Sequence, residues 1–140
     1  MAATDVAPKH LLAAATAVAT IATLGSLYLS LGLGLIPCEL CWYQRILMYP
    51  LVVILGVSTL ESRVEAFKMV LPLSVLGLTV AAYHSYIQLV PDFTSGCSFG
   101  PGATGCTSVQ FKVAIFTVPN LSLIAFILIT GLVAAAAFRR

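Results

Sequence analysis

The stretch from residue 113 to residue 138 reads VAIFTVPNLSLIAFILITGLVAAAAF and contains no Asp, Glu, Lys or Arg. A helix needs about 20 apolar residues to cross the hydrocarbon core of a bilayer, so this stretch is long enough to span a membrane. Two other stretches, residues 10–38 and 69–91, are also free of these charges. A fourth stretch, residues 46–60, reaches the required length if it extends back to Cys41, with Arg45 near the membrane surface.

The composition also favours a membrane protein. Of the 140 residues, 60% are apolar and 9% are charged, whereas a soluble domain carries about 25% charged residues. The net charge is only +2, without a run of like charges, which argues against nucleic-acid binding. Residues 93–111 are uncharged too, but their glycines and Pro101 favour turns, which cannot satisfy their own backbone in lipid.

These patterns predict an all-α integral membrane protein, a four-transmembrane-helix bundle of up-down-up-down topology in a single domain, residues 1–140. The helices are expected at about residues 11–34, 40–60, 69–90 and 118–138, with short links that favour antiparallel neighbours. The first apolar stretch is longer than the core of a secretory signal. We therefore expect it to be retained as a helix.

The positions of the basic residues predict the orientation, because cytoplasmic loops carry an excess of Lys and Arg. With a cytoplasmic N-terminus, the inner face receives Lys9, Arg63, Lys68, Arg139 and Arg140, and the outer face receives Arg45 and Lys112. Both termini are therefore expected in the cytoplasm. The loops at residues 35–39 and 91–117 are expected on the outer face.

All four cysteines fall in or beside these two outer loops: Cys38, Cys41, Cys97 and Cys106. Four cysteines allow three pairings, and the sequence does not choose among them, although Cys38–Cys41 and Cys97–Cys106 are the natural local pairs. Cys-x-x-Cys at a helix start is a poor structural staple and a common redox device, since the helix N-terminus stabilises a thiolate. Redox chemistry is favoured over inert staples and over zinc, and no metal site is predicted.

Two further ionisable residues are expected at membrane depth near the outer face. Arg45 follows Cys41 by one helical turn, so its guanidinium is expected near the Cys41 sulfur, where it favours the thiolate. Anchoring Arg45 at the lipid headgroups is an alternative role. His84 either contacts a ligand or simply bonds to a neighbouring helix. For Gln44 and Gln88, the sequence does not distinguish a contact with a ligand from a structural role.

Three segments carry a family resemblance. Residues 37–45 read PCELCWYQR, which resembles the Pro-Cys-x-Leu-Cys-x-Tyr-x-Arg signature of the DsbB/BdbC family of disulfide bond formation proteins. Residues 84–91, HSYIQLVP, and residues 116–119, FTVP, are similar to the end of that family's third helix and the entry to its fourth. Only eight residues separate Cys97 from Cys106, which resembles the shorter BdbC-like branch. Whether residues 107–118 form an interfacial helix is left open.

The resemblance implies an enzyme of the cell membrane that reoxidises an extracytoplasmic thioredoxin-like carrier of the DsbA or BdbD type and reduces a membrane quinone, ubiquinone or menaquinone. It implies that Cys97 receives the carrier's thiolate, that Cys106 is its partner, and that Cys38 exchanges with this second pair. Cys41 then faces the quinone, with Arg45 and His84 beside the ring.

Two other readings remain open. A vitamin K epoxide reductase-like protein is also a four-helix bundle with two cysteine pairs, but its Cys-x-x-Cys lies near the last helix, whereas here the motif opens the second. A small non-enzymatic membrane protein with two structural disulfides would show inert outer cysteines. Thiol trapping with a reduced carrier distinguishes inert cysteines from redox-active ones.

Overall fold

The computed structural model describes residues 8–34, 39–90, 112–113 and 116–139, and four long helices make up most of them. Helix α1 covers Pro8–Leu27 and continues as a π-helical turn, η2, at Tyr28–Gly32. Helices α2, α3 and α4 cover Glu39–Glu61, Phe67–Leu89 and Val118–Phe138. All four helices are long and apolar enough to cross a membrane, as the charge-free stretches predicted.

A short helix and a pair of short strands were not expected from the sequence. A 3-10 helix, η3, at Val64–Ala66 joins α2 to α3. Strand β1 (Lys112–Val113) pairs with strand β2 (Phe116–Thr117) in antiparallel register, with Lys112 opposite Thr117. The described residues before α4 in the segment 107–118 are therefore these two short strands, and the other regular elements that the structure describes are helical.

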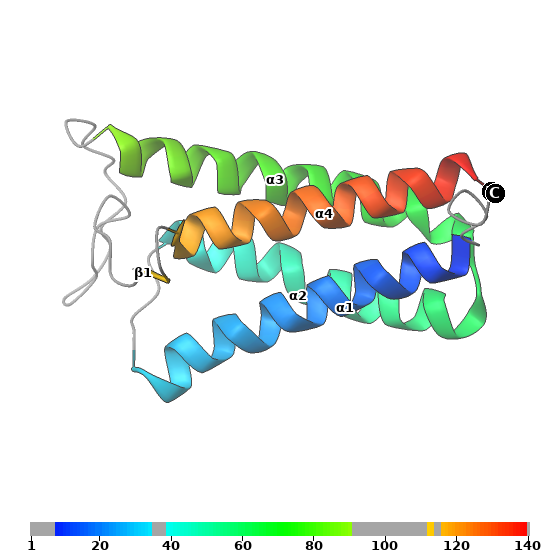
Figure 1. Cartoon of the computed structure of the whole chain (residues 1–140), viewed down its shortest axis with the longest axis horizontal. Coiled ribbons are helices and arrows are strands. Elements are labelled where there is room, and N and C mark those ends of the chain that lie inside the picture. Colours follow the sequence, from blue (N-terminus) through cyan, green and yellow to red (C-terminus); the bar gives the residue numbers. More distant parts are fainter. Residues whose placement is uncertain (1–7, 35–38, 91–111, 114–115, 140) are drawn as a thin grey trace.

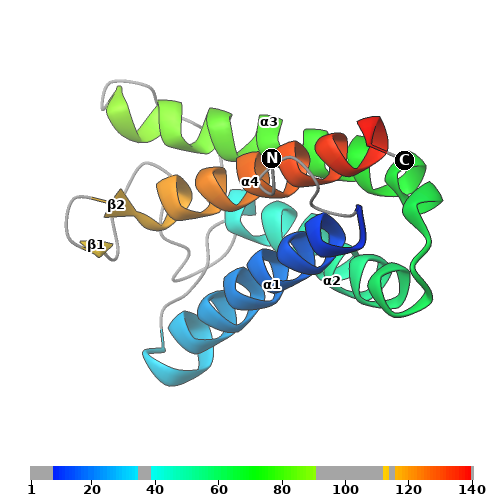
Figure 2. The same cartoon turned by 45° about the vertical axis from the view of Figure 1, so that its right-hand side comes forward.

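The helices form a ring in which each one contacts two neighbours: α1 contacts α2 and α4, and α3 contacts α2 and α4. In both Figure 1 and Figure 2, α4 lies between α1 and α3, and the last turns of α1 diverge from the other helices. Figure 1 shows the end of α1, the start of α2, the end of α3 and the start of α4 at its left-hand side. We call this side the Cys41 end, because Cys41 lies at the start of α2.

Small and aliphatic side chains fill the centre of the ring. The core includes Ala15 and Ala19 from α1, Leu51 and Leu55 from α2, and Phe126 from α4. Outward-facing side chains are equally apolar: Ile21, Val53 and Ile127 are all exposed, as suits a surface in contact with lipid. Hydroxyl pairs join the helices inside the bundle, with Thr16 Oγ1 3.0 Å from Thr59 Oγ1 and Thr130 Oγ1 donating to Ser74 Oγ at 3.1 Å.

Helices α3 and α4 approach each other closely at Gly77. A Cβ atom at this position would lie 2.1 Å from Cε1 and 2.4 Å from Cζ of Phe126, far inside van der Waals contact. Phe126 is fully buried and belongs to the rigid core. Close helix approach at a small residue is the usual way in which membrane helices gain packing energy.

Gly77→Ala is therefore expected to destabilise the bundle by about 1–3 kcal/mol, since the methyl group must displace a buried ring. Thermal unfolding in detergent, followed by circular dichroism, measures the effect. Gly131→Ala is the matched control, because no atom lies within 4 Å of a Cβ at this helical position. Equal melting temperatures for the two variants would show that α3 and α4 tolerate a wider separation.

Candidate functional site

Cys41 is the only cysteine within the described residues, and it lies in the first turn of α2. Its side chain is half-buried and packs against a small apolar cluster of Leu40 and Ile87, which Val80 also joins. Helix α3 therefore covers the start of α2. Cys38, Cys97 and Cys106 lie outside the described residues, so their pairing and their predicted roles stay predictions.

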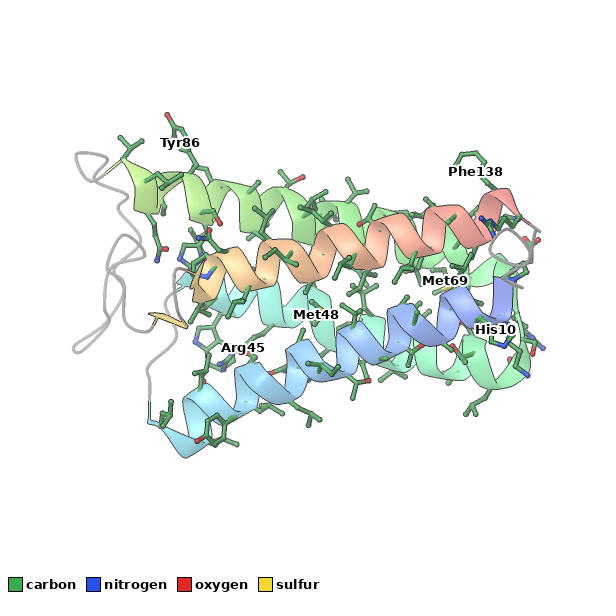
Figure 3. The ribbon with its side chains drawn as sticks, viewed as in Figure 1. His10, Arg45, Met48, Met69, Tyr86 and Phe138 are labelled. Carbon is green, nitrogen blue, oxygen red and sulfur yellow. The ribbon has the colours of Figure 1, made fainter. Side chains whose placement is uncertain are left out.

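Arg45, one turn after Cys41, is held by the end of α1. Its Nε donates to Ser26 Oγ at 2.8 Å, and its Nη2 donates to the Ser26 carbonyl oxygen at 2.9 Å and to Ser30 Oγ. Figure 3 shows Arg45 near the Cys41 end of the bundle. The guanidinium is thus fixed between two helices, which a simple headgroup anchor would not require.

Trp42 adds an aromatic contact to this arrangement. The Cζ atom of Arg45 lies 5.6 Å from the centroid of the Trp42 ring, within the range of a cation–π interaction. The Trp42 side chain is 52% exposed and its neighbour Tyr43 is also exposed. Exposed aromatic residues at a helix end suit a membrane–water interface.

His84 is buried near the end of α3 and bonds to α2. It is 1% exposed, and its Nδ1 lies 3.1 Å from Nε2 of Gln44, which is also buried. An amide nitrogen donates, so Nδ1 is the acceptor in this contact. The Gln44–His84 pair therefore links α2 to α3. Because Gln44 directly precedes Arg45 in α2, this link lies at the level of Arg45.

Two hydroxyl groups near these residues are buried and make no hydrogen bond within the described part of the chain. One is Ser85 Oγ, next to His84, and the other is Thr23 Oγ1, one turn before Leu27 at the end of α1. Buried hydroxyls nearly always have a partner, so each is a candidate contact for a bound molecule or for the rest of the chain. Gln88 lies one turn after His84, half-buried, and carries an interaction of its own.

The opposite end of the bundle carries exposed ion pairs. Arg63 Nε lies 3.0 Å from Glu61, and Lys68 Nζ lies 2.8 Å from Glu65, all with exposed side chains. The C-terminal end of α4 lies at this same end (Figure 1). No set of three or more metal-ligating side chains occurs within the residues that the structure describes. Chemistry based on the described residues is therefore concentrated at the Cys41 end.

Comparison with known proteins identifies the family. Residues 8–136, which run from the start of α1 into the last turn of α4, match the family model "Disulfide bond formation protein DsbB". The chain belongs to the DsbB family. The resemblance drawn from the short motifs is thus confirmed over almost the whole chain.

Individual relatives point the same way. The chain is 48% identical over 114 residues to disulfide bond formation protein C of Bacillus subtilis, covering 80% of this chain and 81% of that protein. It is 41% identical over 110 residues to a probable disulfide formation protein C 1 of Bacillus anthracis, with 78% of each chain covered. A probable disulfide formation protein of Coxiella burnetii is 37% identical over 113 residues, with 80% of this chain and 77% of that protein covered. No solved structure matches the chain.

Family membership and the four apolar helices together define a multi-pass membrane protein of the disulfide bond formation type, and hence an oxidoreductase. The similarity to the Bacillus subtilis protein agrees with the shorter branch expected from the spacing of Cys97 and Cys106. Sequence reasoning selected Cys41, Arg45 and His84, and the structure brings all three to one end of the bundle. It did not find Ser26 and Ser30, and it left the role of Gln44 undecided.

Proposed function

We propose that this DsbB-family chain is a protein-dithiol:quinone oxidoreductase of the cell membrane. It reoxidises an extracytoplasmic thioredoxin-like carrier and delivers the electrons to a membrane quinone, which sustains disulfide formation in exported proteins. The observation that carries the proposal is the placement of Cys41 one helical turn from a fixed cation, at the end of a membrane bundle where a buried histidine also lies.

The four cysteines form a two-step relay in this proposal. The carrier's thiolate attacks Cys97 of a Cys97–Cys106 disulfide, and the carrier leaves oxidised when its second thiolate displaces Cys97. One thiolate of the reduced outer pair then attacks Cys38 of a Cys38–Cys41 disulfide and releases Cys41 as the thiolate. The second outer thiolate displaces Cys38, which restores the Cys97–Cys106 disulfide and leaves the inner pair reduced by two electrons. Transfer of these electrons to a quinone would restore the Cys38–Cys41 disulfide. Each turnover moves two electrons and two protons, the number that a quinone accepts on reduction to a quinol.

The residues at the Cys41 end fit a quinone, whose chemistry is that of a lipid-soluble two-electron acceptor. Such a ring presents two carbonyl oxygens, which require hydrogen-bond donors. Arg45 Nη1 makes no hydrogen bond among the described contacts, and Ser85 Oγ is buried without a described partner, so both can donate. The Arg45 guanidinium also stabilises negative charge, both on Cys41 and on an acceptor oxygen. His84, oriented by Gln44, is the second proposed contact.

The proposed orientation places the Cys41 end at the extracytoplasmic face. Lys9, Arg63, Lys68 and Arg139 belong to the opposite ends of the helices, where basic residues favour the cytoplasm. The alternation of helix ends in Figure 1 supports the up-down-up-down topology, and the basic residues support the placement of both termini inside. The chain is then one membrane domain whose thiol chemistry faces the oxidising compartment.

Quinone reduction by the purified full-length protein tests the proposal. A reduced thioredoxin-like dithiol protein is added with either a short-chain ubiquinone or a short-chain menaquinone, and the loss of quinone absorbance is recorded. We expect one quinone to be consumed for each carrier disulfide formed. Two results would contradict the proposal: cysteines that never exchange with the carrier, as in inert staples, or thiol exchange without quinone consumption.

A further inference from the structure

The serine pair at the end of α1 has no part in the chemistry described so far, yet it makes every described hydrogen bond of Arg45. We infer that Ser26 and Ser30 are positioning residues that hold the Arg45 guanidinium in the orientation needed by the quinone. This inference rests on the proposed function. It gives the end of the first helix a role in quinone binding, although this helix contributes none of the proposed catalytic side chains.

The hydrogen bonds fix the guanidinium along one edge. Nε and Nη2 are engaged by Ser26 through its hydroxyl and its carbonyl oxygen, and Nη2 also reaches the Ser30 hydroxyl. A guanidinium is planar, so two adjacent nitrogens bound in this way determine the direction of the third. The N–H groups of Nη1 remain as the donors that this arrangement directs toward a ligand.

The chemistry of the acceptors preserves the charge of Arg45. The three acceptors, two on Ser26 of α1 and one on Ser30 of η2, are neutral oxygens, so they satisfy the N–H donors without cancelling the positive charge. A long arginine side chain that lacked such partners near a membrane surface would extend toward water and headgroups. The serines therefore retain a full charge within the bundle, where it can act on Cys41 and on a ligand.

The local fold of α1 is adapted at this point. Ser26 lies in the last turn of α1 and Ser30 lies in the π-helical turn that follows, where Leu33 N donates to the Tyr28 carbonyl oxygen at 3.2 Å. Such π-helical turns are rare in proteins overall, and those that do occur are often found at functional sites. The divergence of the last turns of α1 in Figure 2 accompanies this change of helix type.

A purely structural role for the serines, as a link between α1 and α2, makes a different forecast from a positioning role. A link would stabilise the bundle whether or not Arg45 binds a quinone. A positioning residue acts only through Arg45, so its loss should have no further effect once Arg45 has been replaced. A double-mutant cycle separates these two cases.

The test measures quinone binding and the state of the guanidinium in full-length protein. Trp42 is the only tryptophan and lies beside Arg45, so quenching of its fluorescence by a short-chain menaquinone or ubiquinone reports affinity. Ser26→Ala/Ser30→Ala should weaken binding about tenfold, as expected for lost hydrogen bonds to a charged group. In an Arg45→Met background, the same serine changes should alter affinity by less than about twofold. Ser30→Thr, which keeps the hydroxyl, should retain most of the quinone affinity that Ser30→Ala loses.

A second readout needs no quinone. In protein labelled with nitrogen-15 arginine, the Arg45 Nε–H should exchange slowly with water in the wild type and much faster in the double-serine variant. Thr20→Ala is the matched control, because the Thr20 hydroxyl donates to the Thr16 carbonyl oxygen within the same helix. It should change neither measurement.

Three results would overturn the inference. Unchanged quinone affinity in the double-serine variant would show that the serines do not position Arg45. An equal loss of affinity in the wild-type and Arg45→Met backgrounds would assign the serines a structural role. Failure of the wild type to bind quinone would contradict the proposed function itself. Slow exchange of the Arg45 Nε–H in the same sample would then show that Arg45 forms its hydrogen bonds with the serines without a quinone.

Discussion

A Cys41→Ser protein should insert in the membrane normally and lose quinone reduction by about a thousandfold or more, because serine cannot form the disulfide on which the proposed relay depends. The cost in stability should be small. The Cys41 side chain is only half-buried, and serine differs from it by one atom. A Cys38–Cys41 bridge closes a ring of four residues, which contributes little to a bundle held by helix packing in lipid.

Expression level, melting temperature in detergent and quinone reduction should be measured together for Cys41→Ser and for Cys38→Ser. Both variants are expected to match the wild type in the first two properties and to fail in the third. Turnover at the wild-type rate in either variant would show that this motif is not the catalytic dithiol. Loss of the folded protein would instead assign the motif a structural role.

The second large effect concerns the outer pair. In a Cys106→Ser protein, a carrier-linked species should accumulate through Cys97, because the partner thiol that would resolve the mixed disulfide is absent. Wild-type protein should show almost none of this species at steady state. Cys97 lies between Gly96 and Ser98 in the sequence, and we expect these small neighbours to leave its sulfur accessible to a folded carrier.

Mass spectrometry of the trapped complex identifies the linked cysteine. Cys97→Ser is the matched control, and it should give no complex, because the attacked sulfur is missing. Attachment of the carrier to Cys38 or Cys41 would reverse the assigned order of electron flow. It would place the first thiol exchange at the start of α2 instead of in the loop before α4.

The sequence was most informative about the presence and length of the helices. Charges are excluded from the bilayer core, so the gaps between them marked the four helices, with boundaries within about three residues of those observed when η2 is counted together with α1. The extension of α2 back past Arg45 was confirmed as well. The β1–β2 hairpin was missed because two-residue strands have no periodicity that sequence reasoning can detect.

The contacts between helices were beyond sequence reasoning for a physical reason. In a soluble bundle the apolar stripe of a helix reveals its buried face, but here Ile21 faces outward and Ala19 faces inward with equally apolar side chains. The rotation of α1 could therefore not be deduced, nor the approach of Ser26 to Arg45. The Gln44–His84 contact joins residues 40 positions apart, and its prediction would have required the rotations of α2 and α3 about their axes.

The hydrogen bonds between α1 and Arg45 also bear on how the chain is made. An arginine inside a membrane helix raises the free energy of insertion by about 2.5–3.5 kcal/mol at the bilayer centre, and by less near the surface. Because α1 is synthesised before α2, Ser26 and Ser30 are already present when Arg45 leaves the ribosome. The cation then meets its acceptors as the second helix enters, so the first two helices should integrate into the lipid as a paired hairpin.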